Sequence, residues 1–213
     1  GEARAMLAHL RRRQPGARLV LGMRDVVDDP AATVAAWRRE DIVPLLDDVY
    51  DRILVYGQRD VFDPIRAYGL SARAADKVRF VGYLRRAAEP IPPEIRAVLA
   101  ADDRPLVLVT AGGGGDGTPL LEAFARGYAA AEARPPFHAL LVAGPFMPAA
   151  DAARLRRLVD PVGGLALLSS VQGLAGVVAA ADAVVAMAGY NTTCEILSFD
   201  KPALLVPRTT PRR

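Results

Sequence analysis

The stretch Pro105–Thr118, PLVLVTAGGGGDGT, joins an apolar run, a glycine-rich loop and the start of an amphipathic segment. The apolar run is typical of a strand that is covered on both faces of a parallel sheet. In the loop, Ala111–Thr118, successive glycines let backbone N–H groups approach an anion, and a helix start adds a favourable dipole. We therefore predict that Gly112, Gly113 and Gly114 contact a phosphate or the acceptor, with a tight turn that binds no ligand as the alternative.

Two familiar phosphate motifs do not explain this loop. No Lys-Ser or Lys-Thr pair follows it, so it is not a P-loop. Gly112, Gly114 and Gly117 match the Gly-x-Gly-x-x-Gly spacing, but a run of glycines fits that spacing easily. The next apolar run, Phe137–Ala143, ends in Gly144-Pro145 and lacks the acidic residue of a dinucleotide site. A phosphate contact of another kind is expected.

Short apolar runs alternate with amphipathic segments along the chain. The runs predict buried parallel strands, and the segments between them predict helices on both faces of the sheet. The predicted strands are Arg18–Gly22, Arg52–Gly57, Val78–Gly82, Pro105–Thr110, Phe137–Ala143, Leu165–Leu168, Ala183–Met187 and Ala203–Val206. The predicted helices are Ala31–Arg39, Pro44–Tyr50, Glu94–Ala101, Thr118–Ala133, Ala149–Val159, Gly173–Ala180 and Thr193–Ser198. The expected fold class is α/β, a Rossmann-like parallel sheet with helices on both faces, plus a partial second α/β domain.

A Pro-rich segment, Ala87–Pro93 (AAEPIPP), interrupts the alternation. Three predicted strands precede it, too few for a complete doubly wound domain, and five follow it. We expect a first domain over residues 1–83, a linker over 84–93 and a second domain over 94–213. The first domain resembles the end of a domain whose beginning is absent, and Gly1 in place of an initiating Met also indicates a fragment.

The composition excludes several classes of protein. Of the 213 residues, 52% are hydrophobic and 24% are charged, which allows a sizeable core and argues against global disorder. The net charge is only +3 and the arginine pairs are scattered, so no nucleic acid is expected as a partner. The single cysteine, Cys194, excludes a disulfide within the chain. With no secretory signal over Gly1–Gln14 and no apolar run of bilayer length, a cytoplasmic protein is expected.

A second candidate anion site follows the predicted strand Ala183–Met187. Its residues, Gly-Tyr-Asn-Thr-Thr-Cys-Glu at Gly189–Glu195, combine a turn former with side chains that cap helices. A diphosphate would suit the N–H groups of such a helix start. Thr192 and Glu195 also have the spacing of a capping box, in which the acid bonds to the helix's own backbone. A ligand site and a capping box both remain open.

These residues resemble a known family. The stretch Ala181–Glu195 (ADAVVAMAGYNTTCE), followed by Lys201–Pro207 (KPALLVP), is similar to the carboxyl-terminal donor-binding signature of the MurG-like family 28 glycosyltransferases. That family includes the lipid-linked N-acetylglucosaminyltransferase of peptidoglycan synthesis. The segment Thr110–Thr118 resembles its second-domain glycine loop, and the likeness runs from about Val78 to the end. Pieces nearer the start resemble less characterised predicted glycosyltransferases: LGMRD at Leu21–Asp25, VYG at Val55–Gly57 and VFDP at Val61–Pro64.

The resemblance implies the GT-B architecture of two Rossmann-like domains. Residues 1–83 would be the carboxyl-terminal part of the acceptor-side domain, and residues 94–213 a nucleotide-sugar (donor) domain that is truncated at its end. The implied reaction transfers a sugar, with inversion and without a metal, from a nucleoside diphosphate sugar, commonly a UDP sugar, to a hydroxyl of unknown identity. The nucleotide sugar is a substrate, so no cofactor is expected. The catalytic base would lie in the absent amino-terminal region, so the fragment alone should be inactive.

The family motif also implies roles for single residues. Glu195 would bind the ribose, and Gly189, Asn191 and Thr192 would lie at the diphosphate. The backbone at Val171 would read the base.

An arginine that contacts phosphate in the family is matched by Arg85 or Arg86, and the spacing leaves both open. The expected partner is a nucleoside diphosphate sugar. Two further associations are left open: a peripheral one with the inner face of the membrane, and one with a partner chain that supplies the missing half. Two other functions stay open: a nucleotide-sugar hydrolase or epimerase on the same fold, and a non-catalytic sugar-nucleotide-binding subunit.

Overall fold

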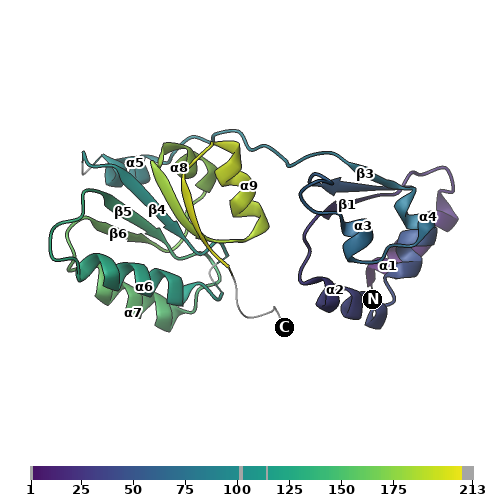
Figure 1. Ribbon diagram of the computed structural model, residues 1–213, viewed down its shortest axis with the longest axis horizontal. Coiled ribbons are helices and arrows are strands. Elements are labelled where there is room, and N and C mark those ends of the chain that lie inside the picture. The colour runs from purple at the N-terminus through teal and green to yellow at the C-terminus, as the bar shows by residue number, and fades with distance from the viewer. Residues whose placement is uncertain (1, 101–102, 114, 208–213) are drawn as a thin grey trace. The chain divides into compact units, whose positions relative to one another are not determined.

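The computed structural model describes residues 2–100, 103–113 and 115–207, and they form two compact units, Gly1–Leu84 and Arg85–Arg213 (Figure 1). Each unit contains one parallel sheet, and the two sheets do not share a strand. Strand and helix alternate along both units, as the pattern of apolar runs predicts.

The first unit has a three-stranded sheet in the order β1-β2-β3, so each new strand is added on the same side. Its strands are β1 (Val20–Arg24), β2 (Arg52–Tyr56) and β3 (Val78–Phe80). Its helices are α1 (Glu2–Arg13), α2 (Pro30–Arg39), the π-helix η1 (Leu45–Val49), α3 (Pro64–Ala67) and α4 (Ala72–Ala75). The fully buried Ile53 and Val55 of β2 lie at the centre of its core.

The predicted first strand, Arg18–Gly22, is placed two residues too early. In the structure Val20–Arg24 pairs with all of β2, so the strand continues through Gly22. A Cβ at Gly22 would lie 2.1 Å from the hydroxyl oxygen of Tyr56, so this close approach requires glycine. The pairing with β2, which lies far away in the sequence, therefore sets the true limits of the strand.

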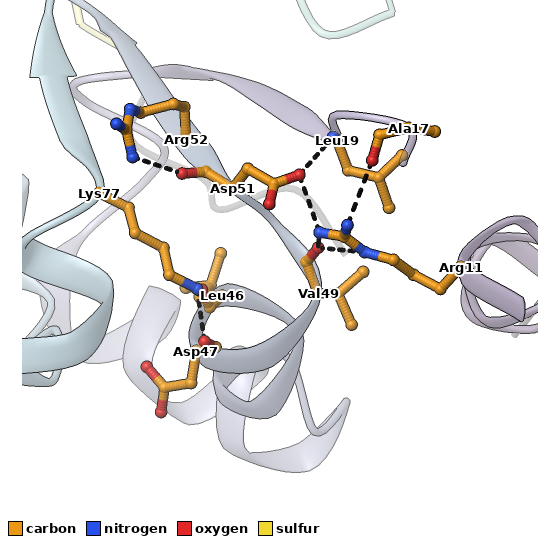
Figure 2. A network of polar contacts seen from close by, with 9 residues as sticks. All are labelled: Arg11, Ala17, Leu19, Leu46, Asp47, Val49, Asp51, Arg52 and Lys77. Atoms are coloured by element: carbon orange, nitrogen blue, oxygen red, sulfur yellow. Dashed lines mark hydrogen bonds and ion pairs between the residues drawn. The ribbon is translucent and has the colours of Figure 1, made fainter. Parts of the chain in front are cut away.

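A network of polar contacts ties helix α1 to the edge of the first sheet at which the strands begin (Figure 2). The guanidinium of Arg11 donates to the carbonyl oxygens of Ala17 and Val49 and pairs with Asp51 at 2.8 Å. Asp51 also accepts the Leu19 N–H at 2.7 Å. That N–H, together with Arg11, holds the pKa of the Asp51 carboxyl below its usual value. Helix α1 is thus fastened by charge-assisted hydrogen bonds as well as by packing.

The second unit has a five-stranded parallel sheet in the order β6-β5-β4-β7-β8. Its strands are β4 (Leu106–Thr110), β5 (His138–Val142), β6 (Leu165–Leu168), β7 (Ala183–Met187) and β8 (Ala203–Val206). Its helices are α5 (Pro93–Leu99), α6 (Thr118–Ala129), α7 (Ala149–Val159), α8 (Leu174–Ala180) and α9 (Tyr190–Ser198). In Figure 1, α6 and α7 cover one face of this sheet, and α5, α8 and α9 cover the other.

The two faces of the second sheet explain its continuous apolar runs. Leu108 and Leu140 point to the side of α8 and α9, whereas Val109 and Leu141 point to the side of α6 and α7. All four side chains are fully buried. Successive strand residues alternate between faces, so a sheet that is covered on both faces needs apolar residues at every position. The predicted fold class, a parallel α/β sheet with helices on both faces, is confirmed.

The segment between β3 and α5 contains no regular element over residues 81–92. Part of it packs on the second unit, because the Arg86 N–H donates to Ser198 Oγ at 2.9 Å. The Glu89 carbonyl oxygen lies against Gly176 of α8, where a Cβ would be only 2.2 Å away. Among the described residues, no helix has the length and apolar character needed to cross a membrane.

Candidate functional site

In the second sheet, strands are added first on one side of β4 and later on its other side. The chain proceeds from β4 to β5 and β6 on one side, and β7 and β8 are added on the other side. The connections that leave β4 and β7 therefore diverge and open a crevice at the carboxyl ends of these two strands. The glycine-rich loop follows β4 and the segment Gly189–Glu195 follows β7, so both candidate segments lie at this crevice.

Gly112 and Thr192 meet across the crevice. The hydroxyl oxygen of Thr192 is 3.6 Å from the place that a Cβ on Gly112 would occupy. Gly112 has a φ of +65°, a conformation that glycine adopts without strain, and its N–H donates to Thr110 Oγ1 at 3.1 Å. The bare backbone of the loop is thus turned toward the first turn of α9. Of the other predicted loop residues, Gly113 lies beside Gly112, and Gly114 lies outside the described residues.

The loop after β5 completes this arrangement. The Phe146 N–H donates to the Gly113 carbonyl oxygen at 2.9 Å. Gly144 has a φ of +95°, and a Cβ there would lie 2.4 Å from the Gly112 carbonyl oxygen. Two backbones therefore pack against each other without a side chain between them. The residues Gly144–Phe146 were not predicted as part of the site, although a Gly-Pro pair directly after a buried strand was a usable signal.

A cavity of about 260 Å³ opens beside these loops. It brings Gly112 together with Val171, two of the predicted site residues. Its lining consists of Gly112, Val142, Gly144, Pro145, Ser170, Val171, Gln172 and Leu174. The lining surface of the cavity is mostly apolar, which suits the flat ring of a base.

Helix α9 begins earlier than predicted, and this corrects the capping interpretation. The helix starts at Tyr190 instead of Thr193, with Gly189 as its N-cap and no side-chain hydrogen bond at the cap. Asn191 and Thr192 therefore lie within the first turn, and the proposed capping box is wrong. Thr192 is buried, with 7% of its surface exposed, and its hydroxyl is on the side of Gly112. A helix that starts without a side-chain cap is suited to present its first N–H groups to an anion.

Glu195 of α9 lies close to Arg86, which belongs to the segment before α5, and neither residue lines the cavity. Burial raises the pKa of the half-buried Glu195 carboxyl, the positive charge of Arg86 lowers it, and the negative charge of Glu89 raises it further. Arg86 is held there by the hydrogen bond from its N–H to Ser198. Arg85 is not among the charges that shift the pKa of Glu195. Of the two arginines that the sequence left open, Arg86 is thus the one beside the predicted ribose-binding acid.

No protein-family model matches the chain, and no curated protein matches it. Solved structures do match. The glycotransferase of kitacinnamycin has 18% identity and a TM-score of 0.55, over 96% of this chain and 62% of that chain. WaaG, a glycosyltransferase involved in lipopolysaccharide biosynthesis, has 17% identity and a TM-score of 0.56, over 94% and 62%. HepE from Anabaena, solved in complex with UDP-glucose, has 16% identity and a TM-score of 0.55, over 88% and 53%.

At these identities the likeness shows the fold, which is that of GT-B glycosyltransferases of several families. The chain spans about three fifths of the length of the first of these proteins. Membership of family 28 in particular stays a prediction, as do the roles of the individual site residues.

Proposed function

We propose that this chain is part of a GT-B glycosyltransferase and that its second unit binds the nucleoside diphosphate of a sugar donor. The observation that carries the proposal is the approach of the Thr192 hydroxyl to Gly112, 3.6 Å from the place that a Cβ on Gly112 would occupy, next to the 260 Å³ cavity. A bare glycine backbone and an uncapped helix start there face the same small space. Phosphate oxygens carry negative charge and accept hydrogen bonds, so they suit a space bounded by N–H groups.

Each part of a nucleotide sugar can be assigned to residues at or near the crevice of the second sheet. The diphosphate would lie between the glycine loop and the first turn of α9, near Gly189, Asn191 and Thr192. The base would enter the cavity at Val171, where backbone groups distinguish one base from another. The ribose would reach Glu195, with Arg86 supplying positive charge beside it. HepE from Anabaena, which shares the fold, was solved in complex with UDP-glucose, and this supports a UDP sugar as the first donor to test.

The proposed chemistry is inverting transfer without a metal, as in family 28. Cleavage of the anomeric bond leaves a nucleoside diphosphate whose charge must be stabilised. The start of α9 and Arg86 would provide this stabilisation, and a base would deprotonate the acceptor hydroxyl. If the reaction needs no metal, a chelator should leave the activity of the full-length enzyme unchanged. Loss of activity with the chelator, restored by added Mg²⁺, would contradict this part of the proposal.

The decisive experiment is a calorimetric titration of the full-length protein with UDP, GDP, dTDP and ADP. We expect UDP to bind most tightly. If none of the four nucleotides binds, the donor-site assignment fails. Binding of UDP without sugar transfer to any acceptor, but with hydrolysis of a UDP sugar, would instead indicate a hydrolase.

Two neighbouring threonines offer a matched test of the diphosphate position. Thr192→Val removes the hydroxyl that lies against Gly112 and keeps the shape of the side chain. Its neighbour Thr193 makes no such contact, so Thr193→Val is the control. We expect Thr192→Val to weaken UDP binding about tenfold, the usual scale of a lost hydrogen bond to a charged group. Equal UDP affinity in the two variants would remove Thr192 from the site.

A further inference from the structure

A buried carboxylate lies at the end of β1 in the first unit. Asp25 is only 1% exposed. Its Oδ1 accepts the Val26 N–H at 2.7 Å, and its Oδ2 accepts the Tyr83 hydroxyl at 2.7 Å. A carboxylate withdrawn from water needs such donors, so both hydrogen bonds belong to the folded state.

The ends of all three strands of the first sheet converge on this carboxylate. Asp25 follows β1, Gly57 follows β2 and Tyr83 follows β3 shortly after its end. A Cβ on Gly57 would lie 2.3 Å from Asp25 Oδ2, so any side chain at position 57 would displace the carboxylate. Asp25 is therefore packed against the end of the neighbouring strand β2 and hydrogen-bonded to a residue that follows β3, the strand beyond it.

Tyr68 fixes the loop that carries Asp25. Its hydroxyl accepts the Val27 N–H at 2.8 Å and donates to the Asp25 carbonyl oxygen at 3.2 Å. The ring is itself held by an edge contact with Trp37, whose centroid is 5.3 Å away. Tyr68 thus fixes the backbone that carries the Asp25 carboxylate, so the Tyr83 hydroxyl donates to a group whose position is already set.

Tyr83 lies next to the last residue of the first unit. The first unit ends at Leu84, and no regular element follows until α5 begins at Pro93. Before Tyr83, the N–H groups of Val81 and Gly82 still bond to the end of β2. The hydrogen bond from Tyr83 to Asp25 thus extends the attachment of the chain to the first sheet to within one residue of the end of the first unit.

We propose that Asp25 is a positioning residue that fastens the carboxyl-terminal end of the first unit. By accepting the hydrogen bond of the Tyr83 hydroxyl, Asp25 keeps residues 81–83 part of the first unit. This role is independent of the ligand and of the proposed reaction. It belongs to the aspartate of the LGMRD segment, which the donor site does not use.

Hydrogen exchange of the full chain, read peptide by peptide, tests the anchor. Tyr83→Phe keeps the ring and removes only the hydroxyl. We expect amide exchange over residues 81–84 to become about tenfold faster, which corresponds to one lost hydrogen bond in a local opening. Exchange in β2 should stay unchanged. Tyr128→Phe is the matched control, because that hydroxyl donates to the Phe137 carbonyl oxygen in the second unit.

A double-mutant comparison shows whether Asp25 is the partner responsible. In an Asp25→Asn background, Tyr83→Phe should accelerate exchange over residues 81–84 by a clearly smaller factor than in the wild type. An equal factor in both backgrounds would overturn the role of Asp25. Unchanged exchange in Tyr83→Phe, or faster exchange across the whole first unit, would overturn the local anchor.

Discussion

Two glycines in helices of the second unit should respond in opposite ways to the same substitution. Gly127 lies in α6, and a Cβ there would meet nothing within 4 Å. Gly176 lies in α8, and a Cβ there would lie 2.2 Å from the carbonyl oxygen of Glu89. Replacing glycine by alanine in a helix contributes up to about 1 kcal/mol through propensity alone. The propensity gain is similar at both sites, so the difference between the two variants isolates the steric clash.

The size of the clash follows from the geometry. An ordinary contact needs about 3.5 Å, so the Glu89 carbonyl must move by more than about 1 Å in Gly176→Ala. Overpacking that shifts the backbone costs about 1–3 kcal/mol. We therefore expect Gly127→Ala to raise the free energy of unfolding by about 0.5–1 kcal/mol. Gly176→Ala should unfold with a free energy about 1–3 kcal/mol below that of Gly127→Ala.

Urea denaturation followed by circular dichroism measures both values in the same buffer. The Gly176→Ala variant should also expose the segment around Glu89 to proteolysis, because the contact of this segment with α8 is lost. If the two variants are stabilised equally, the segment before α5 does not pack on α8. The position of Arg86 beside Glu195 would then lose its structural support as well.

Three further predictions concern the core and two carboxylates. Leu140→Ala in β5, where the side chain is fully buried, should lower the free energy of unfolding by about 2–5 kcal/mol in a urea titration; a loss below 1 kcal/mol would contradict the described packing. The pKa of Asp51 is lowered on folding, so the ionised carboxylate stabilises the fold above the pKa of the unfolded chain, and this stabilisation is lost as the pH falls. The stability advantage of the wild type over Asp51→Asn should therefore shrink in acid, and a difference that stays constant with pH would refute this. The pKa of Glu195 is raised by burial, so the wild type loses stability as the pH rises through that pKa. Glu195→Gln should therefore become more stable relative to the wild type as the pH rises from acidic to neutral. If Glu195→Gln instead becomes less stable relative to the wild type over that range, burial is not the dominant cause.

The strands and helices of the second unit were largely predictable from the sequence. The bounds of β6, α7, β7 and β8 agree with the predicted segments. Each of these strands is an uninterrupted apolar run, and α7 begins directly after Pro148. Local residue preferences agree with the structure there, and in β7 and α7 tertiary burial favours the same elements.

Elements that depend on distant contacts were not predictable in the same way. Helix α1 was not predicted, and it is fastened by the hydrogen bonds of Arg11 to Val49 and Asp51. Leu45–Val49 was predicted as part of an ordinary helix but forms a π-helix. Its end is held by Lys77, whose ammonium group donates to the carbonyl oxygens of Leu46 and Asp47 (Figure 2). These partners lie far apart in the sequence, so no local pattern contains them.

The candidate site, too, was predictable only where it depends on local sequence. That the glycine loop and Gly189–Glu195 lie at strand ends follows from the sequence, because both come directly after apolar runs. That Gly112 contacts Thr192 follows only from the strand order, which places β7 beside β4. The start of α9 at Tyr190 was missed because a Thr-x-x-Glu pattern favours a later start.

The strand order of the second unit has a consequence for biosynthesis. Strand β4 is made first, yet its partners on either side, β5 and β7, leave the ribosome later, and β7 follows only after three more helices. Until then the apolar edge of β4 is unpaired, a state that favours aggregation and slows folding. The first unit adds its strands in chain order and can fold as it is made. During synthesis, chaperones should therefore be needed for the second unit much more than for the unit that precedes it.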